Sequence, residues 1–511
     1  MSGEHKAVRA AGRDWALLTA WLASLALIRS GSLDERDPYW QIRAGLENLA
    51  GAPLARPDTW SWAPIDNLFY PNSPGWNLLL AGAYKAGGFW GLFALSVVAM
   101  GGYLALTVLV ARALGARPLP GLVALVPLLL LALPWFSPRA TIIVQASLML
   151  SVHLCLVWRP LARGHGPLVN ALVVGVAGFT LSAAGNWIHL SWIPLSLLVA
   201  AAWAVFWLLD DGLDRHRRWA LISAGAIGLV LGTLTTPYGV AVGLERAAAA
   251  ERACAGLIVE WLPLMTPGLP AQWLVTGIVG AAATLACVVW VATSLRRGRP
   301  HAPTLPGLAA LTVIAAPATI AGFVAVRFQG VALLTLAPIA AVAGTIIADR
   351  AKASAAARPI QGAWRTKRLR EWATGHPWRV ILTSVIVVLS PGTALLALLH
   401  AQPPEHEIAA RIPQGCHLFS DDGTSGAIVL LRPDVKVWID GRADYYGRER
   451  LTATREYLRA TSTQVVPAGT TCVVLPAAAP ESALLAARLA RDPAWIEADR
   501  EKGFTLWLPS A

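Results

Sequence analysis

Apolar residues recur in long runs through the first 400 positions of the chain, and short polar segments separate these runs. A transmembrane helix needs roughly 20 mostly apolar residues. The runs therefore predict about eleven membrane spans in a domain that covers residues 1–400. The predicted spans are 14–31, 88–111, 119–135, 140–158, 167–185, 187–209, 218–236, 272–295, 305–325, 329–348 and 379–400.

Basic residues fall on one side of this arrangement. With the N-terminus in the cytoplasm, every basic cluster lies in a cytoplasmic loop, where Lys and Arg are normally enriched. An odd number of spans then places the C-terminus outside. The first span runs into a Trp- and Asp-rich segment without a small-residue cleavage site, so we expect a membrane helix and not a cleaved signal peptide. The clusters contain Lys6, Arg9, Arg13, Arg112, Arg117, Arg159, Arg163, Arg215, Arg217, Arg218, Arg296, Arg297, Arg299, Arg350 and Lys352.

Three outer segments are long. The first, 32–87, is polar and rich in Trp and Pro, and we expect interfacial helices in it; the second is 237–271. The third, 401–511, loses the membrane pattern and predicts a small extracytoplasmic α/β domain. Its expected strands are Ala427–Leu431, Val435–Ile439 and Cys472–Leu475, and its expected helices are Glu449–Ala460 and Glu481–Leu489.

Composition supports a polytopic α-helical membrane protein. Of the 511 residues, 56% are hydrophobic and 14% are charged, whereas soluble chains carry about 25% charged residues. The net charge of +12 follows from the basic loops, so we expect no nucleic-acid partner. The five cysteines form no CxxC or Cys/His pattern, but Cys416 and Cys472 share the outer domain. They are either a disulfide or two unpaired core cysteines.

An acidic stretch follows the first span directly. Asp34, Glu35 and Asp37 stand at the membrane boundary, where a carboxylate can act as a general base or can simply keep a helix end in water. The three acids could also hold a divalent metal. We expect no other cofactor, and the chain has no phosphate-cradling Gly-rich loop.

Polar residues recur at the same outer depth. Each alone could be an interfacial anchor, but together they predict a site for a lipid phosphate and a sugar. Arginine pairs with phosphate through its planar fork, and aromatic faces cover a sugar. The predicted substrate-binding residues are Trp40, Arg43, Arg139, Asn186, His189, Tyr238, Glu260 and Arg327.

The order of several short motifs resembles the GT-C membrane glycosyltransferases, and more narrowly a group of bacterial multispan proteins near that fold. One position departs from the group, since Gln41 stands where its members usually have His. The matching stretches are Asp37-Pro38-Tyr39-Trp40-Gln41 with Gly45, Arg56-Pro57-Asp58-Thr59-Trp60-Ser61-Trp62, Pro138-Arg139, Asn186-Trp187-Ile188-His189, Pro237-Tyr238-Gly239, Glu260-Trp261, and Trp438-Ile439-Asp440-Gly441-Arg442-Ala443-Asp444-Tyr445-Tyr446-Gly447.

This resemblance implies an inverting transfer from a polyprenyl-phosphate sugar to a cell-envelope glycan, lipid or protein at the outer face of a bacterial inner membrane. Asp37 is then the first choice for the catalytic base, with Asp34 and Asp58 in reserve. Arg327 or Arg139 would stabilise the departing lipid phosphate.

Two other functions compete with this one. A transporter or flippase of a lipid-linked or envelope precursor would use the outer polar residues as a vestibule, although no repeated halves or midplane charges are evident. A non-catalytic scaffold would present the outer domain to an envelope partner. The Asp440-Gly441-Arg442 stretch is likewise open to two interpretations: a structural turn, or part of an outer domain that covers the active site and binds an acceptor glycan or peptide.

Overall fold

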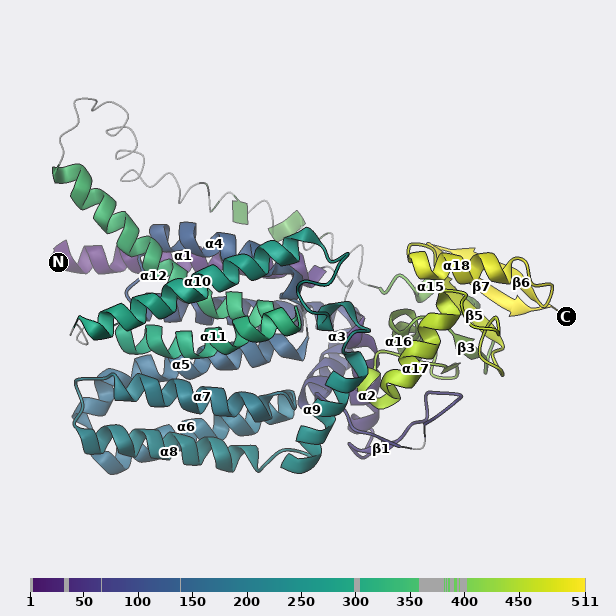
Figure 1. Cartoon of the computed structure of the whole chain (residues 1–511), viewed down its shortest axis with the longest axis horizontal. Helices are drawn as coiled ribbons and strands as arrows, with labels where there is room; N and C mark the ends of the chain where they lie inside the picture. Colours follow the sequence, from purple (N-terminus) through teal and green to yellow (C-terminus); the bar gives the residue numbers. More distant parts are fainter. Residues whose placement is uncertain are drawn as a thin grey trace.

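The computed structural model describes residues 3–31, 36–65, 67–137, 139–297, 304–357 and 402–510, together with a few single positions between 381 and 395. The chain forms a long helical bundle with a smaller α/β domain at one end, and the two termini lie at opposite ends of the molecule (Figure 1). A polytopic helical protein with a C-terminal α/β domain is therefore what the structure contains.

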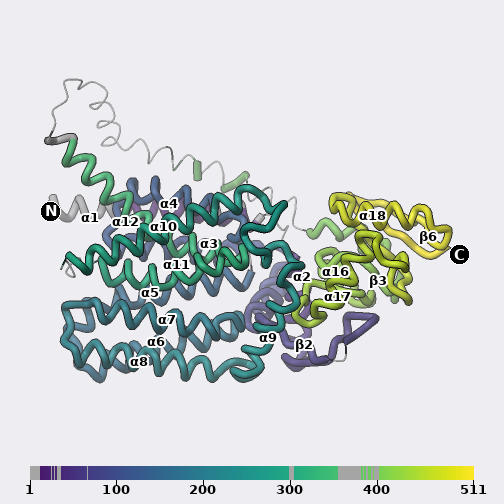
Figure 2. The backbone as a smooth tube through the Cα atoms, viewed as in Figure 1, coloured from purple at the N-terminus to yellow at the C-terminus, as the bar shows by residue number. Residues whose placement is uncertain are grey.

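The bundle consists of long helices that run side by side (Figure 2). Seven helices in the described part of the chain are long and apolar enough to cross a membrane. They are α3 (Pro74–Ala113), α4 (Pro118–Ala132) with the short turn η1 (Leu133–Trp135), α5 (Ala140–Gly164), α6 (Pro167–Ile188), α10 (Ala271–Arg296), α11 (Leu305–Val324) and α12 (Phe328–Ala357).

Three further helices coincide with predicted spans but are not among these seven: α1 (Gly3–Gly31), α7 (Trp192–Leu208) and α8 (Arg215–Thr233). Helix α7 has only 17 residues, because the chain turns at 189–191, inside the segment predicted as one span. Helix α8 begins with basic residues that shorten its apolar stretch. The predicted span 379–400 lies largely outside the described residues, so the number eleven remains a prediction.

Glycines allow two bundle helices to touch. A Cβ atom at Gly228 of α8 would lie 2.1 Å from the carbonyl oxygen of Gly175 of α6, and one at Gly178 would lie 2.8 Å from that of Gly225. Small residues at such positions let two membrane helices approach backbone to backbone. This contact explains why α8 packs in the bundle although it is not among the seven apolar helices.

Shorter elements lie between the bundle and the α/β domain. The first outer segment forms α2 (Asp37–Leu49) and a two-stranded ribbon of β1 (Arg56–Pro57) and β2 (Leu68–Phe69). The second outer segment, predicted as a loop, contains α9 (Val240–Cys254) and the 3-10 helix η2 (Val259–Trp261). Both segments face the C-terminal domain (Figure 1).

The C-terminal domain is a five-stranded sheet with helices, and its strand order is β4-β3-β5-β7-β6. The first three neighbours pair in parallel, and β7 and β6 add antiparallel strands. The elements are α15 (His406–Arg411), β3 (His417–Phe419), α16 (Asp422–Leu431), β4 (Lys436–Val437), α17 (Ala443–Leu458), β5 (Cys472–Pro476), α18 (Pro480–Leu489), β6 (Trp495–Glu501) and β7 (Phe504–Pro509).

One predicted strand is wrong. Residues Ala427–Leu431 belong to helix α16, whose N-cap Asp421 accepts a hydrogen bond from the backbone of Thr424. The apolar run is continuous because the helix is buried on several sides: Leu430 packs in the bundle core and Ile428 in the core of the α/β domain. A short apolar run of this kind does not distinguish a strand from a buried helix. The other predicted strands and helices lie at or near β4, β5, α17 and α18.

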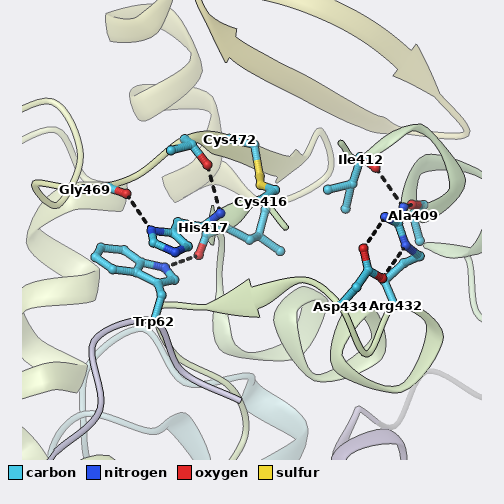
Figure 3. The surroundings of a disulfide bond; sticks show 11 residues. Trp62, Ala409, Ile412, Cys416, His417, Arg432, Asp434, Gly469 and Cys472 are labelled. Atoms are coloured by element: carbon cyan, nitrogen blue, oxygen red, sulfur yellow. Dashed lines mark hydrogen bonds and ion pairs between the residues drawn. A yellow bond between two sulfur atoms is a disulfide. The ribbon is translucent and has the colours of Figure 1, made fainter. Parts of the chain in front are cut away.

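Cys416 and Cys472 form a disulfide with a Cα–Cα distance of 6.1 Å (Figure 3). The bond links the segment before β3 to the start of β5, which is the neighbouring strand. Of the two alternatives that the sequence leaves open, the structure contains the bonded pair.

Replacing both Cys416 and Cys472 with Ala should lower the free energy of unfolding of the α/β domain by about 4 kcal/mol, because the bond spans 56 residues in the unfolded chain. The temperature at which a protease begins to cleave this domain in nanodiscs measures the effect. Cys287→Ala, which removes a buried free thiol, is the control. Equal resistance of the double variant and the wild type would contradict the expectation.

Candidate functional site

The first outer segment and the C-terminal domain are joined through their backbones. Val437 N donates to Trp60 O at 2.9 Å, and Trp62 N donates to Val437 O at 3.2 Å. The Trp62 indole stacks on the ring of His417 and donates to Leu418 O at 3.1 Å (Figure 3). The outer loop thus extends the edge of the sheet at β4, so that the two parts form one body.

A buried arginine is at the centre of this junction. The Arg442 side chain has no exposed surface; its Nη1 donates to Asp58 at 2.9 Å, while its Nε and Nη2 donate to Asp440 at 2.8 and 2.7 Å. Tyr446 accepts from Arg442 and donates to Asp440. The guanidinium also lies 4.1 Å from the ring centre of Trp60. Such full pairing is what a buried charge requires.

Both carboxylate oxygens of Asp58 therefore already accept hydrogen bonds within the protein. One of its oxygens accepts from Arg442 and from the backbone of Trp60, the other accepts from the backbone of Ser61, and its side chain is fully buried. This environment favours a structural role for Asp58, because a general base must reach the hydroxyl that it deprotonates. Asp34, the other reserve, lies outside the described residues.

Asp37 is placed differently. It is the first residue of α2, its Oδ2 lies 3.5 Å from Arg139 Nε, and its Oδ1 accepts from the Trp40 indole at 3.4 Å. Its side chain is 36% exposed. A helix N-terminus favours an anion at this position. Asp37 is thus an oriented carboxylate that solvent, and an acceptor, can reach.

Asp37 and Arg139 begin a chain of charges to which four segments contribute. Arg139 Nη1 donates to Glu260 at 2.8 Å, and Arg327 Nη1 lies 3.4 Å from the other oxygen of Glu260. The Arg327 guanidinium also lies 4.2 Å from the ring centre of Trp261. Burial would raise the pKa of Glu260, but the charges of Arg139 and Arg327 lower it below its ordinary value. Two cations thus hold one carboxylate ionised beside Asp37.

His189 contributes to the same charged region. Burial and the charge of Arg327 lower its pKa to about 4, so its ring is neutral at neutral pH. Its Nδ1 accepts from the backbone N–H of Ser191 at 3.0 Å, just after the end of α6. Of the predicted residues, the structure joins Asp37, Trp40, Arg139, Glu260 and Arg327 through contacts, and the charge of Arg327 also acts on His189.

The remaining predicted residues have other partners. Arg43 pairs with Glu47 one turn along α2 at 2.8 Å. Asn186 is buried and donates to Ser182 O in its own helix, and the Tyr238 hydroxyl donates to Pro71 O at 3.0 Å. Their predicted role in substrate binding stays untested, although these contacts favour positions that stabilise the fold.

Sequence reasoning missed two carboxylates from the C-terminal domain. Asp422 is exposed at the surface in the first turn of α16, but the protein atoms around it desolvate its carboxyl group, and this desolvation and the charges of Asp421 and Asp37 raise its pKa to about 6. Burial also raises the pKa of Asp444 to about 6, against the opposing charges of Arg246 and Arg442. Asp421 and Asp422 stand where an acidic helix start is expected, but only the folded chain brings them close to Asp37.

Among the described residues, no group of three or more His, Cys, Asp or Glu side chains is arranged to hold a metal ion. Asp34 and Glu35 lie outside that part of the chain, so a divalent metal held with Asp37 stays a prediction.

No protein-family model and no curated protein matches the sequence. The structure is similar to that of the archaeal oligosaccharyltransferase AglB from Archaeoglobus fulgidus in complex with an inhibitory peptide and a dolichol-phosphate. The similarity covers 90% of this chain and 69% of the other, at 12% identity and a TM-score of 0.45. The apo form of the same oligosaccharyltransferase has the same values, and a form tethered to an acceptor peptide with the NVT sequon has 13% identity and a TM-score of 0.43. These neighbours have the GT-C fold. Substrate and mechanism do not follow from a likeness this distant.

Asp422→Asn should raise the apparent melting temperature at pH 8 by about 2 °C or more. A carboxyl whose pKa is raised by folding opposes folding while it is ionised, so the gain should shrink as the pH falls through 6 toward 4. Thermal unfolding in nanodiscs at several pH values measures this.

Asp434→Asn is the control of opposite sign. The hydrogen bonds from Arg432 lower the pKa of Asp434 to about 2, so its stabilising effect is present above pH 4 and this variant should melt lower at pH 8. If Asp422→Asn also melts lower at pH 8, the environment described for Asp422 is wrong.

Proposed function

We propose that the chain is a glycosyltransferase that moves a sugar from a polyprenyl-phosphate donor to a cell-envelope glycan, lipid or protein, with Asp37 as the general base. One observation carries this proposal: an accessible carboxylate, Asp37, stands at the end of a charge chain formed by Arg139, Glu260 and Arg327. A base beside one guanidinium group, with a second guanidinium linked to it through Glu260, suits transfer from a phosphate leaving group.

The proposed step is an inverting displacement. The acceptor oxygen forms a bond to the anomeric carbon of the sugar, and its proton passes to Asp37. The bond from the anomeric carbon to the phosphate oxygen breaks, and the electron pair leaves with the polyprenyl phosphate. Arg327, whose contact with Glu260 is the longer of the two, is the arginine that the phosphate would recruit. A donor that stabilises charge in this way is worth roughly 3 kcal/mol.

The surroundings suit a donor with a lipid tail. Arg139 and Arg327 directly precede the apolar helices α5 and α12, so their charges stand at one end of the bundle. Exposed apolar side chains include Phe328, which follows Arg327 directly, Met265, which lies in the segment between Glu260 and α10, and Leu274, in the first turn of α10. A phosphate at Arg327 would therefore have its tail beside an apolar surface and its sugar toward the C-terminal domain.

The disulfide and the basic residues support an extracytoplasmic site in a bacterial inner membrane. A disulfide persists in an oxidising compartment, and Cys416 and Cys472 lie in the domain that packs against Trp40 and Ala44 of α2, the helix that Asp37 begins. At the opposite end of the bundle, Arg159 and Arg163 surround the buried carboxylate of Asp210. Basic residues of this kind favour the cytoplasmic side.

Asp37→Asn should reduce turnover by about 1000-fold while donor binding persists, because the amide cannot accept the acceptor proton. Arg327→Gln should reduce turnover by about 100-fold. The assay uses the full chain in nanodiscs with a panel of polyprenyl-phosphate sugars, and it follows release of the lipid phosphate and the mass of the product. Asp492→Asn, in an exposed turn of the outer domain, is the matched control.

Normal turnover by Asp37→Asn would remove Asp37 from the role of base. If the wild type binds none of the donors in the panel, the result counts against a glycosyltransferase and favours the transporter or the scaffold. Loss of turnover in Asp37→Asn together with loss of binding would assign Asp37 to binding instead of proton transfer.

A cysteine introduced at the exposed Ser510 should react with a membrane-impermeant maleimide in intact spheroplasts. A cysteine at the exposed His216, at the other end of the bundle, should react only after permeabilisation. The native free cysteines are buried and give a low background. The reverse labelling pattern would contradict an outer location of the C-terminal domain.

A further inference from the structure

The turn at Asp440-Gly441-Arg442 touches Asp37 and the residue that holds it. A Cβ atom at Gly441 would lie 2.5 Å from Nε1 of Trp40, 2.7 Å from its Cδ1 and 3.3 Å from Oδ1 of Asp37. Real Cβ atoms do not approach other atoms as closely as the first two distances. Position 441 therefore accepts only glycine unless the indole moves.

The Asp440-Gly441-Arg442 turn has little freedom to move away from the Trp40 indole. Arg442, the next residue, is anchored in the buried network with Asp58 and Asp440, and its backbone N–H donates to Asp440 at 3.0 Å. Removing one partner of a buried ion pair is strongly destabilising. The location of Gly441 relative to the first outer segment is thus set by charges that cannot separate without leaving an unpaired one.

Trp40 links the position of Gly441 to that of Asp37. It lies one helical turn after Asp37 on α2, it is 3% exposed, and its N–H donates to Asp37 Oδ1 at 3.4 Å. Its ring meets Phe69 edge-on, and Gly426 of α16 also faces its Cδ1 atom, but at a longer distance than Gly441. The Asp37 carboxylate is accordingly held between Trp40 on one oxygen and Arg139 on the other.

We infer that Gly441 is a positioning residue: the Asp440-Gly441-Arg442 turn fixes the position of the Trp40 indole, and the indole fixes the orientation of the Asp37 carboxylate. Its effect on turnover rests on the function proposed above, whereas its effect on Asp37 does not. The outer domain is then part of the reaction site and not only a module that captures the acceptor. Misplacement of a reacting group by about 1 Å can cost about 100-fold in rate.

Gly441→Ala and Gly426→Ala form a matched pair. A Cβ atom at Gly426 would lie 3.8 Å from Cδ1 of the same indole, which is an ordinary contact. Gly426→Ala should therefore keep wild-type behaviour. Gly441→Ala should lower kcat by about 100-fold and change the KM for the donor by less than about twofold.

Introducing Gly441→Ala into the Trp40→Phe variant distinguishes a positioning role from local misfolding. In Trp40→Phe the smaller ring leaves room where the indole nitrogen stood, so Gly441→Ala should add little further loss there. Non-additivity of this kind identifies two residues that act through one contact. An equal loss from Gly441→Ala in both backgrounds would overturn the inference.

A readout that needs no turnover is the labelling of Asp37 by a water-soluble carbodiimide, quantified by mass spectrometry of the folded protein. Gly441→Ala should increase labelling severalfold, because the carboxylate loses its contacts with Trp40 and Arg139, and Gly426→Ala should not. Increased labelling in a chain that shows no transferase activity would support the positioning role and contradict the proposed function. Unchanged labelling of a folded Gly441→Ala protein would overturn the positioning role whatever the activity.

Discussion

The buried guanidinium of Arg442 is the constraint on which the site depends. It receives one carboxylate from the first outer segment, Asp58, and one from its own turn, Asp440, and aromatic rings of both parts surround it. A charge in such a place is tolerable only when all its partners are present. Docking of the outer domain and ordering of the outer loop are therefore one event, although Asp58 and Arg442 are 384 positions apart in the chain.

The bundle contributes through the positions of its helix ends. Arg139 and Arg327 precede α5 and α12, Glu260 lies in η2 ahead of α10, and Asp37 opens α2. Polar side chains are costly inside a bilayer, so they gather where spans end. Helices of similar length then bring these ends to one depth, and four separate segments can supply a single row of alternating charges.

The sequence predicted the coarse fold well and its finer parts unevenly. Length and apolarity identify helices such as α5 and α10 because both properties are local. The run Ala427–Leu431 was expected to be a strand because its partners, the bundle core and the core of the outer domain, are distant in sequence. Asp58 looked like Asp37 in the sequence, and only the position of Arg442 shows that one carboxylate is enclosed while the other is accessible.

By itself, the sequence determined that this chain is a multispan membrane protein with a polar α/β tail, and it predicted that the functional site lies at the outer ends of the spans. Hydropathy and the distribution of basic residues are local properties, so they predict membrane spans and their orientation without knowledge of the tertiary structure. Tertiary structure alone decided which of those residues meet. It joined Asp37 to Arg139, enclosed Asp58, and set Gly441 against Trp40, because contacts between distant segments depend on packing that no local pattern records.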